Sequence, residues 1–388
     1  MSAFDFYTLT DINWHGKIAL LRADFNVPMV DGNCTDDTRI RAALPTIHHI
    51  LENGGGVLCL SHLGRPRAGE PNPARSLAPV AAQLQNLISQ DVVFCRNWPT
   101  QQPPPGAVWM LENTRFNVGE KENSPDLAAR YATLGDVFVM DAFATAHRAE
   151  ASTSALAQAT SACCAGLLLQ AEVEALKKAL FNPTKPVVAV VGGAKVSTKL
   201  AALNNLMQTC DYLIAGGGIA NTLLLAEENP IGNSLAEHDM LGEAKKFLSA
   251  HADKTLLPED VTVVDGSGEN IRVLRLSELS DIGDGRIVDV GPAACAAYGR
   301  VLAKAGTIIW NGPLGWFEQP PFSAGTRALA AMIAASPAYS LAGGGDTLAA
   351  VAQSEVKSGI SYLSTGGGAF LQFIEGSPMP GLASVLKR

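Results

Sequence analysis

Charged residues are scarce in this sequence. Asp, Glu, Lys and Arg make up only 17% of its 388 residues, against about 25% in an average soluble domain. Disordered chains combine many charges with few apolar residues, and 47% of this chain is hydrophobic, so extensive disorder is excluded. The net charge of −8 argues against broad nucleic-acid binding, because that function normally shows a basic excess.

Cysteine motifs and long apolar runs are also missing. The seven cysteines form no CxxC pair and no Cys/His spacing typical of a metal site, which indicates reduced thiols in a cytosolic protein. The first residues include Asp5 and Asp11 and lack the basic and apolar regions of a signal peptide. No run of about 18 apolar residues occurs that would suit a membrane span. We therefore expect a soluble, cytoplasmic protein.

What the chain does contain is an alternation of short apolar runs and amphipathic segments. Continuous apolar runs suit strands that are buried on both faces of a parallel sheet. The runs are 18–21, 57–60, 92–94, 108–111, 137–140, 187–191, 212–215, 261–264, 307–310, 339–342 and 362–364. Predicted helices between them include 77–88, 171–180, 199–207 and 325–335. This pattern predicts an α/β fold with its active groups near the carboxyl ends of the strands.

The length predicts two large domains, at roughly 150 residues per domain. The best boundary is the segment 181–186, where Pro183 and Pro186 end the preceding helix. We expect a first domain over 1–171, a linking helix and hinge over 172–185, and a second domain over 186–371.

Glycines follow four apolar runs in the second half of the chain. The segments are VVAVVGGAK (187–195), YLIAGGGIAN (212–221), YSLAGGGDT (339–347) and YLSTGGGA (362–369). Glycines at a strand-to-helix turn let the backbone approach a ligand, and helix-start N–H groups favour an anion. Four such turns predict one shared phosphate or nucleotide site. It is neither a P-loop of the GxxxxGK[ST] type nor a GxGxxG dinucleotide site, since both patterns are absent.

Three charged residues near these glycines are candidates for that site. Lys195 and Lys199 are four residues apart and share one helix face, which we expect to face bound phosphates. Asp346 either caps the following helix or holds Mg²⁺ together with phosphate oxygens. The sequence leaves these two roles of Asp346 open.

Arginines lie near predicted strand ends and loops in the first half. Taken singly, each is more typical of a surface or structural ion pair, but together at strand ends they indicate a basic cleft for a small polyanion. The set is Arg22, Arg39, Arg65, Arg115 and Arg148. We interpret His62 as a ligand contact and His147 as structural, because phosphoryl transfer depends on positioning and charge more than on proton transfer.

An anion cleft on one domain and a nucleotide site on the other favour a two-substrate kinase. One alternative is a Rossmann-type dehydrogenase, although its glycine fingerprint is absent. Another is a non-catalytic phosphosugar- or nucleotide-binding protein, which would tolerate loss of Lys195 or Arg39.

Ordered motifs along nearly the whole chain resemble those of the phosphoglycerate kinase family. They are RADFNVP (22–28), DDTRIRAALPTI (36–47), SHLGRP (61–66), LENTRF (111–116), AHR (146–148), GGAKVSTK (192–199), GGGIANT (216–222), LLPEDV (256–261), WNGPLGWFE (310–318), GGGDT (343–347) and STGGGA (364–369). The resemblance implies two Rossmann-like three-layer α/β domains with parallel sheets, a hinge helix and an interdomain cleft. It also implies a C-terminal tail, 372–388, that returns to the first domain, and a monomer.

The implied activity is reversible, Mg²⁺-dependent transfer of the acyl phosphate of 1,3-bisphosphoglycerate to ADP, giving 3-phosphoglycerate and ATP in glycolysis and gluconeogenesis. The implied phosphoglycerate contacts are Asp24, Phe25, Asn26, Arg39, His62, Leu63, Gly64, Arg65, Arg115 and Arg148. The implied nucleotide contacts are Gly193, Lys199, Gly217, Gly218, Gly291, Asn311, Pro313, Glu318, Gly344, Gly345, Asp346 and Thr347. Asp346 would hold Mg²⁺ and Glu318 the ribose, while Arg39, Lys195 and Lys199 would be catalytic, with Lys195 nearest the transferring phosphoryl group.

Four residues depart from the family pattern. Ala144 stands at a usual Gly, Glu150 at a frequent His or Gln, Ala294 at a Ser or Thr, and Gln372 at a frequent Glu. We expect none of them to touch the residues assigned to chemistry, so that they affect affinity rather than reaction type.

Overall fold

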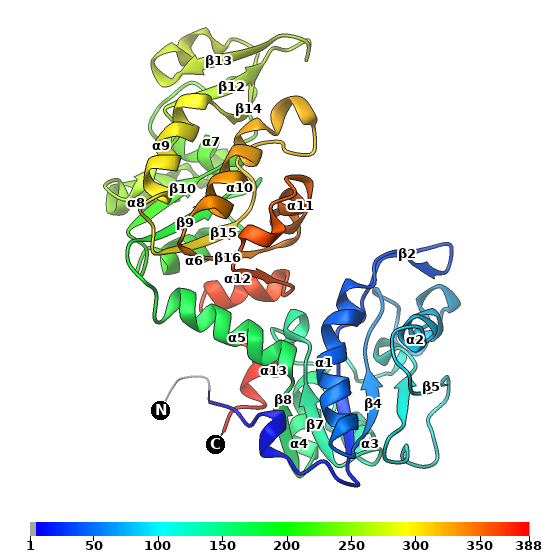
Figure 1. Cartoon of the computed structure of the whole chain (residues 1–388). Helices are drawn as coiled ribbons and strands as arrows, with labels where there is room; N and C mark the ends of the chain where they lie inside the picture. Colours follow the sequence, from blue (N-terminus) through cyan, green and yellow to red (C-terminus); the bar gives the residue numbers. More distant parts are fainter. Residues whose placement is uncertain (1–4, 388) are drawn as a thin grey trace. The chain divides into compact units, whose positions relative to one another are not determined.

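The computed structural model describes residues 5–387. The chain forms two compact units, one with the residues up to Glu174 and those from Pro378 onward, the other with Ala175–Ser377. Helix α5 (Leu167–Leu180) carries the chain from the first unit into the second (Figure 1). Among the described residues, no helix is long and apolar enough to cross a membrane.

The first unit is built on a six-stranded, wholly parallel sheet (Figure 1). Its spatial order is β5-β6-β4-β1-β7-β8. The strands are β1 (Ile18–Arg22), β4 (Gly56–Leu60), β5 (Val92–Cys95), β6 (Val108–Leu111), β7 (Val137–Met140) and β8 (Ala162–Ala165). The chain adds strands on one side of β1 before it returns to the other side with β7, so the strand order reverses at β1.

Helices cover both faces of this sheet. One face packs on α1 and α2, where Ala19 and Val57 share a core with Ile47 and Val80. Leu20 on the opposite face is also fully buried, as a three-layer arrangement requires. The helices of the unit are α1 (Thr38–Glu52), α2 (Ala78–Gln85), α3 (Pro125–Ala132), α4 (Leu156–Ala159) and α13 (Pro380–Ala383), and β2 (Met29–Val30) and β3 (Asn33–Cys34) form a small ribbon.

The last described residues are part of this first unit. The backbone N–H of Gly381 donates to the carbonyl of Ala146 at 2.8 Å, and that of Lys387 donates to Asp5 at 2.7 Å. The hydroxyl of Ser384 donates to the carbonyl of Thr153 at 3.2 Å.

The second unit also has a six-stranded parallel sheet, in the order β11-β10-β9-β15-β16-β17. Its strands are β9 (Val187–Val191), β10 (Tyr212–Ala215), β11 (Thr255–Leu256), β15 (Thr307–Asn311), β16 (Tyr339–Gly343) and β17 (Tyr362–Ser364). The strand order reverses between β9 and β15. Its helices are α6 (Leu200–Leu206), α7 (Gly217–Ala226), α8 (Leu241–His251), α9 (Pro292–Leu302), α10 (Ala324–Ala335), α11 (Gly345–Gln353) and α12 (Gly368–Ile374).

One predicted parallel strand belongs to a different sheet. The apolar run 261–264 lies in β12 (Asp260–Val264), which pairs antiparallel with β13 (Ile271–Arg275) and β14 (Arg286–Val290). The expectation of a parallel strand is therefore wrong here. β12 is buried because it has its own small core, in which Val261 and Val263 pack on Leu279 and Ile282.

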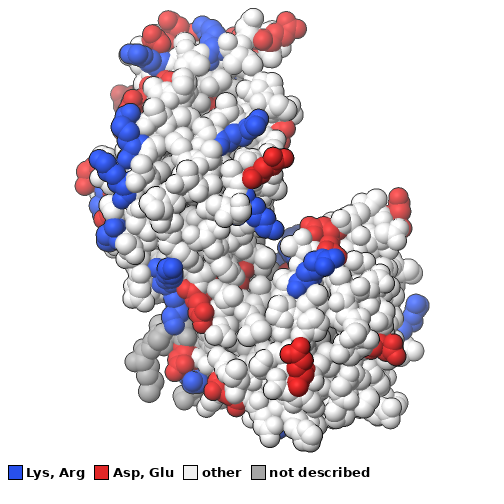
Figure 2. Space-filling model, in the orientation of Figure 1, with Lys and Arg blue, Asp and Glu red and all other residues white. Residues whose placement is uncertain are grey.

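Charged side chains are sparse on the surface that can be seen. Figure 2 shows the visible face of each unit as mostly uncharged, with acidic and basic side chains scattered among uncharged ones. This agrees with the low charged fraction of 17%.

Candidate functional site: an arginine cluster and a glycine-lined cavity

The arginines of the first unit come from the carboxyl ends of neighbouring strands. Arg22 ends β1, and His62 follows β4 by two residues. Arg115 lies in the short 3-10 helix Thr114–Phe116 after β6, and Arg148 follows β7. Because β6, β4, β1 and β7 are adjacent in the sheet, residues far apart in the sequence meet where the strand order reverses, the usual place for a ligand site in such sheets.

His62 is held neutral at the centre of this cluster. Its pKa lies well below the usual value because the ring is buried, and because Arg22, then Arg115, Arg148 and Arg39, add positive potential. Its Nδ1 lies 3.3 Å from Nη2 of Arg22. A neutral imidazole surrounded by guanidinium groups can hydrogen-bond an anion without adding charge.

The arginines differ in how many of their N–H donors are already bonded to other residues of the protein. Arg22 is fully buried and donates to Ser152 and to the carbonyl of Ala23. Arg39 pairs with the Asp24 carboxylate. Arg65 is exposed, and Arg148 is half-buried, with its pKa lowered by burial and by neighbouring Arg115.

Four predicted contact residues fix the loops around the cluster. The side chains of Phe25 and Leu63 are buried in the core, so only their backbone atoms are available to a ligand. The Oδ1 of Asn26 accepts the N–H of Gly64 at 2.8 Å. The N–H of Phe25 donates to the hydroxyl of Ser61 at 2.8 Å, and these bonds join the loops after β1 and β4.

The second unit has a cavity of about 480 Å³ at the carboxyl ends of its strands. The predicted nucleotide residues that line it are Gly193, Gly217, Gly218, Pro313, Glu318 and Asp346. Close packing of the loops requires glycine, since a Cβ on Gly192 would lie 1.7 Å from the carbonyl oxygen of Pro313.

The expectation that Lys195 and Lys199 share one helix face is wrong, because α6 begins at Leu200, after both residues. Lys199 is bonded within the glycine loops. Its Nζ donates to the carbonyl of Gly192 at 2.6 Å and to both Oδ1 (2.6 Å) and the carbonyl (3.2 Å) of Asn311. Burial lowers its pKa to about 8. Lys199 thus ties the first glycine loop to the end of β15, whereas Lys195 is exposed.

Other predicted nucleotide residues support the loops and do not line the cavity. Thr347 accepts the N–H of Gly312 and donates to the carbonyl of Gly343, both at 2.8 Å, and Asn311 donates to Gly343 at 2.7 Å. Gly291 is the residue before α9, where a Cβ would lie 2.3 Å from the Asp260 carboxyl carbon. Gly344, with φ at 98°, precedes α11, whose first residue is Gly345.

Comparisons with known proteins identify the family of the chain. A family profile described as phosphoglycerate kinase matches residues 9–377. The phosphoglycerate kinase of Francisella tularensis subsp. holarctica is 48% identical over 381 residues, 97% of each chain. The chain belongs to the phosphoglycerate kinase family.

Solved structures agree. The phosphoglycerate kinase from Coxiella burnetii has a TM-score of 0.93 at 48% identity, over 98% of each chain. The one from Pyrococcus horikoshii OT3 has a TM-score of 0.84 at 31% identity, also over 98% of each chain. The predicted resemblance, α/β fold class and kinase function are therefore confirmed, and the dehydrogenase alternative is excluded. The chain is a phosphotransferase with a carboxyl acceptor and acts in glycolysis.

One departure from the phosphoglycerate kinase pattern does touch an assigned residue, contrary to expectation. The Oε1 of Glu150 accepts a hydrogen bond from Nη2 of Arg115 at 3.0 Å. The prediction was wrong because 35 residues separate the two in sequence. The loops after β6 and β7 meet only because both strands end at the same edge of the parallel sheet, with β4 and β1 between them.

The cavity also contains a residue that the sequence reasoning missed. Asp289 lines it, and burial raises its pKa to about 7 although it accepts the N–H groups of Gly325 and Val290. A signal was present in the sequence, because Asp289 lies two residues before Gly291, which was itself assigned to the nucleotide site.

The donor set fits Mg²⁺ bound with nucleotide phosphates. The described residues contain no group of three or more His, Cys, Asp or Glu able to hold a metal ion. Asp346 presents one carboxylate in the first turn of α11, lines the cavity and acts electrostatically on Lys199. Mg²⁺ is commonly held in this way, by one or two carboxylates together with substrate phosphates.

Proposed function

We propose that the first unit binds 3-phosphoglycerate or 1,3-bisphosphoglycerate and that the second binds ATP or ADP with Mg²⁺. The observation that carries this is the convergence of Arg22, Arg115 and Arg148 on neutral His62, at the point where the strand order reverses. Such a cluster suits a small polyanion, because guanidinium groups bind phosphate through paired N–H donors.

Within the first unit, the phosphate end of the substrate is assigned to His62, Arg65, Arg115 and Arg148. Asp24 and Asn26 are assigned to its hydroxyl and carboxyl region. The backbone of Phe25, Leu63 and Gly64 forms part of the same loops, which are held in place by N–H hydrogen bonds that the side chains of Asn26 and Ser61 accept.

Within the second unit, the assignment follows the glycine-lined cavity. Gly193, Gly217, Gly218 and Pro313 form the walls that receive the nucleotide, with Glu318 at the ribose. Asn311, Thr347, Gly291, Gly344 and Gly345 shape the surrounding loops. Asp346 would hold Mg²⁺, which neutralises phosphate charge when it is bound.

The proposed catalysis is electrostatic. Negative charge spreads over the oxygens of the transferring phosphoryl group, and fixed positive groups lower the barrier. Arg39 and exposed Lys195 are the candidates for direct contact. Lys199 holds the glycine loop through three hydrogen bonds, and its contribution is therefore to loop geometry as well as charge.

We also propose that the protein is a cytoplasmic monomer with domains at 1–171 and 186–371, a hinge over 172–185 and a tail over 372–388 on the first domain. The glycolytic role supports the location, as do the seven cysteines, all free in the described part of the chain. The compact units, with boundaries after Glu174 and Ser377, support the division. Light scattering during gel filtration measures the oligomeric state.

The test is a coupled assay of purified protein with 3-phosphoglycerate, ATP and Mg²⁺. A second enzyme reduces the 1,3-bisphosphoglycerate that forms, and the oxidation of its NADH is measured by absorbance. Turnover should require all three components. A Lys195→Ala preparation, purified identically, controls for contaminating host enzyme. No turnover above that control would refute the assignment.

A further inference from the structure

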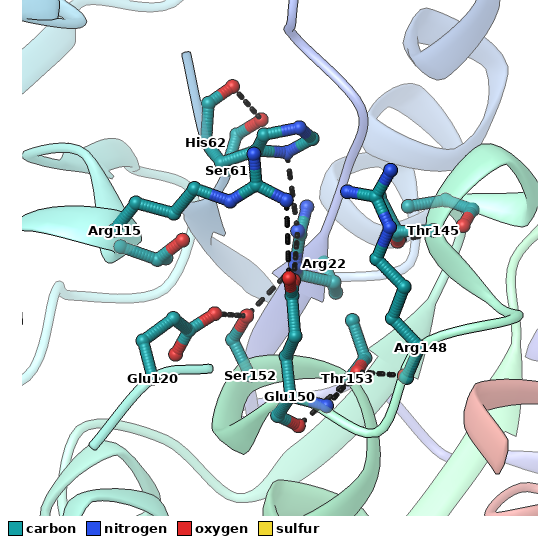
Figure 3. A network of polar contacts seen from close by, with 12 residues as sticks. Arg22, Ser61, His62, Arg115, Glu120, Thr145, Arg148, Glu150, Ser152 and Thr153 are labelled. Carbon is teal, nitrogen blue, oxygen red and sulfur yellow. Dashed lines mark hydrogen bonds and ion pairs between the residues drawn. The ribbon is translucent and has the colours of Figure 1, made fainter. Parts of the chain in front are cut away.

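A buried carboxylate lies inside the arginine cluster of the first unit. Glu150 is 5% exposed, and its neighbours Arg22 and Arg115 are 0% and 5% exposed. Figure 3 shows the Glu150 side chain directed from the loop after Arg148 toward Arg115, Arg22 and His62. Isolated buried carboxylates are costly unless paired, so this placement needs an explanation.

The contacts of Glu150 are made to arginines. Its Oε1 accepts from Nη2 of Arg115 at 3.0 Å, and its Oε2 lies 4.0 Å from Nη2 of Arg22. Among the described residues, this Oε2 has no hydrogen-bond partner. The nearby carboxylate of Glu120 is linked to Arg22 through the hydroxyl of Ser152. The carboxylate paired directly with Arg115 is that of Glu150.

The backbone of Glu150 is fixed as well. Its N–H donates to the hydroxyl of Thr153 at 3.0 Å, and that hydroxyl donates to the carbonyl of Arg148 at 2.8 Å. These bonds fix the turn from which the Glu150 side chain extends.

Arg115 is held on two sides by these bonds. Its Nη1 donates to the carbonyl of Gly64 at 2.8 Å and its Nη2 to Glu150. Two of five N–H donors are thus used, which fixes the plane of the guanidinium. A phosphate that binds to the remaining N–H donors of Arg115 would therefore lie on the other side of the guanidinium from the negative charge of Glu150.

We propose that Glu150 is a positioning and specificity-determining residue of the phosphoglycerate site. It orients Arg115 and at the same time weakens the binding of the doubly charged phosphate of 3-phosphoglycerate, which favours release of that product. The inference rests on the proposed assignment of Arg115 to this phosphate.

The size of the effect follows from Coulomb's law. A carboxylate and a phosphate dianion roughly 6 Å apart, in a partly hydrated site with an effective dielectric constant of about 40 to 80, change the dissociation constant about 10- to 100-fold. A neutral side chain at position 150 should therefore increase affinity by that factor. If the substitution instead misaligned Arg115, the affinity for 3-phosphoglycerate would decrease.

The experiment compares Glu150→Gln with the full-length wild-type protein. Gln keeps an oxygen acceptor for Arg115 and removes only the charge. We expect the dissociation constant and the KM for 3-phosphoglycerate to fall about 10- to 100-fold, with the KM for ATP unchanged. The inhibition constant of inorganic sulfate, a dianion without the glycerate part, should fall in parallel.

Two variants serve as controls. Glu150→Asp keeps the charge and should show no gain in affinity. Glu52→Gln removes one charge from the exposed end of α1. This end precedes the start of β4, whereas the arginine cluster lies at the carboxyl ends of the strands. The variant should therefore leave the dissociation constant, both KM values and the inhibition constant of sulfate unchanged. If Glu150→Gln does not fold, Glu150→His repeats the test with another largely neutral side chain.

The outcomes are distinct. A raised or unchanged dissociation constant for 3-phosphoglycerate in the neutral variants overturns the inference and leaves Glu150 a structural residue. Failure of wild-type protein to bind 3-phosphoglycerate, or wild-type affinity in Arg115→Ala, instead refutes the assignment on which it rests.

Discussion

Asp141 offers a sharp test of the energetics of the first unit. It follows β7 at the base of the loop that carries Arg148, and it is completely buried. Its Oδ1 accepts the N–H groups of Leu168 at 2.9 Å and Leu169 at 3.1 Å, in the first turn of α5. Burial nevertheless raises its pKa from 3.8 to about 6, because desolvation outweighs these hydrogen bonds.

The magnitude follows from the two pKa values. A difference of about 2 pKa units corresponds to about 3 kcal/mol of cost for ionised Asp141 at neutral pH. The helix dipole of α5 favours the charge by only about 0.3–1 kcal/mol, so desolvation wins. A folded-state pKa above the unfolded one means that the stabilising contribution is complete below pH 3.8 and is lost as pH rises through about 6.

We therefore predict that Asp141→Asn stabilises the first unit at pH 8 and has little effect near pH 4. Asn keeps the Oδ1 acceptor and carries no charge. The gain at pH 8 should approach about 3 kcal/mol, and thermal unfolding should move upward by roughly 2–4 °C per kcal/mol. Urea unfolding between pH 4 and 8, followed by circular dichroism, measures it.

Asp136→Asn is the matched control, because the partly exposed Asp136 accepts the N–H of Ile18 at 2.7 Å and keeps access to water. It should show no pH-dependent gain. Equal stability of wild type and Asp141→Asn at pH 8 would show that the hydrogen bonds to α5 need the ionised form, and would refute the reasoning.

Three further predictions concern catalysis. Arg39→Ala and Lys195→Ala should each lower kcat on the order of 100-fold if the charges act mainly in the transition state; a raised KM with unchanged kcat would reassign them to substrate binding. Asp346→Asn should raise the Mg²⁺ concentration needed for half-maximal rate while leaving the KM for 3-phosphoglycerate unchanged, and an unaltered Mg²⁺ titration would remove Asp346 from the metal site. Because direct transfer requires the two substrates to meet, X-ray scattering with both bound should report a smaller radius of gyration than either alone, and identical profiles would contradict this.

Strand positions were well predicted from the sequence, but their pairing was not. The run 187–191 coincides with β9 because a strand buried on both faces is apolar throughout. The run 261–264 is apolar throughout as well, but it pairs antiparallel in another sheet. An apolar sequence indicates that a strand is buried and does not specify which strand it pairs with. The edge strand β8 was missed because Ala162–Ala165 is short and made of small residues.

The candidate site divides in a similar way. Arginines and glycines at strand ends were predicted because parallel topology brings carboxyl ends together. The sequence did not predict the contact between Glu150 and Arg115, nor the hydrogen bonds of Lys199 to Gly192 and Asn311. Both depend on which loops touch, over separations of 35 and 112 residues for the contacts with Arg115 and Asn311, and no local pattern encodes that.

The route of the chain also sets an order of events during synthesis. Strands β1 to β8 leave the ribosome before any of the second unit, and α13 leaves after all of it. The bond from Gly381 to Ala146, two residues before Arg148, therefore forms only when translation has passed the whole nucleotide-binding half. In a nascent chain that is stalled within that half, the loop around Arg148 still lacks this bond, so the arginine cluster is completed last.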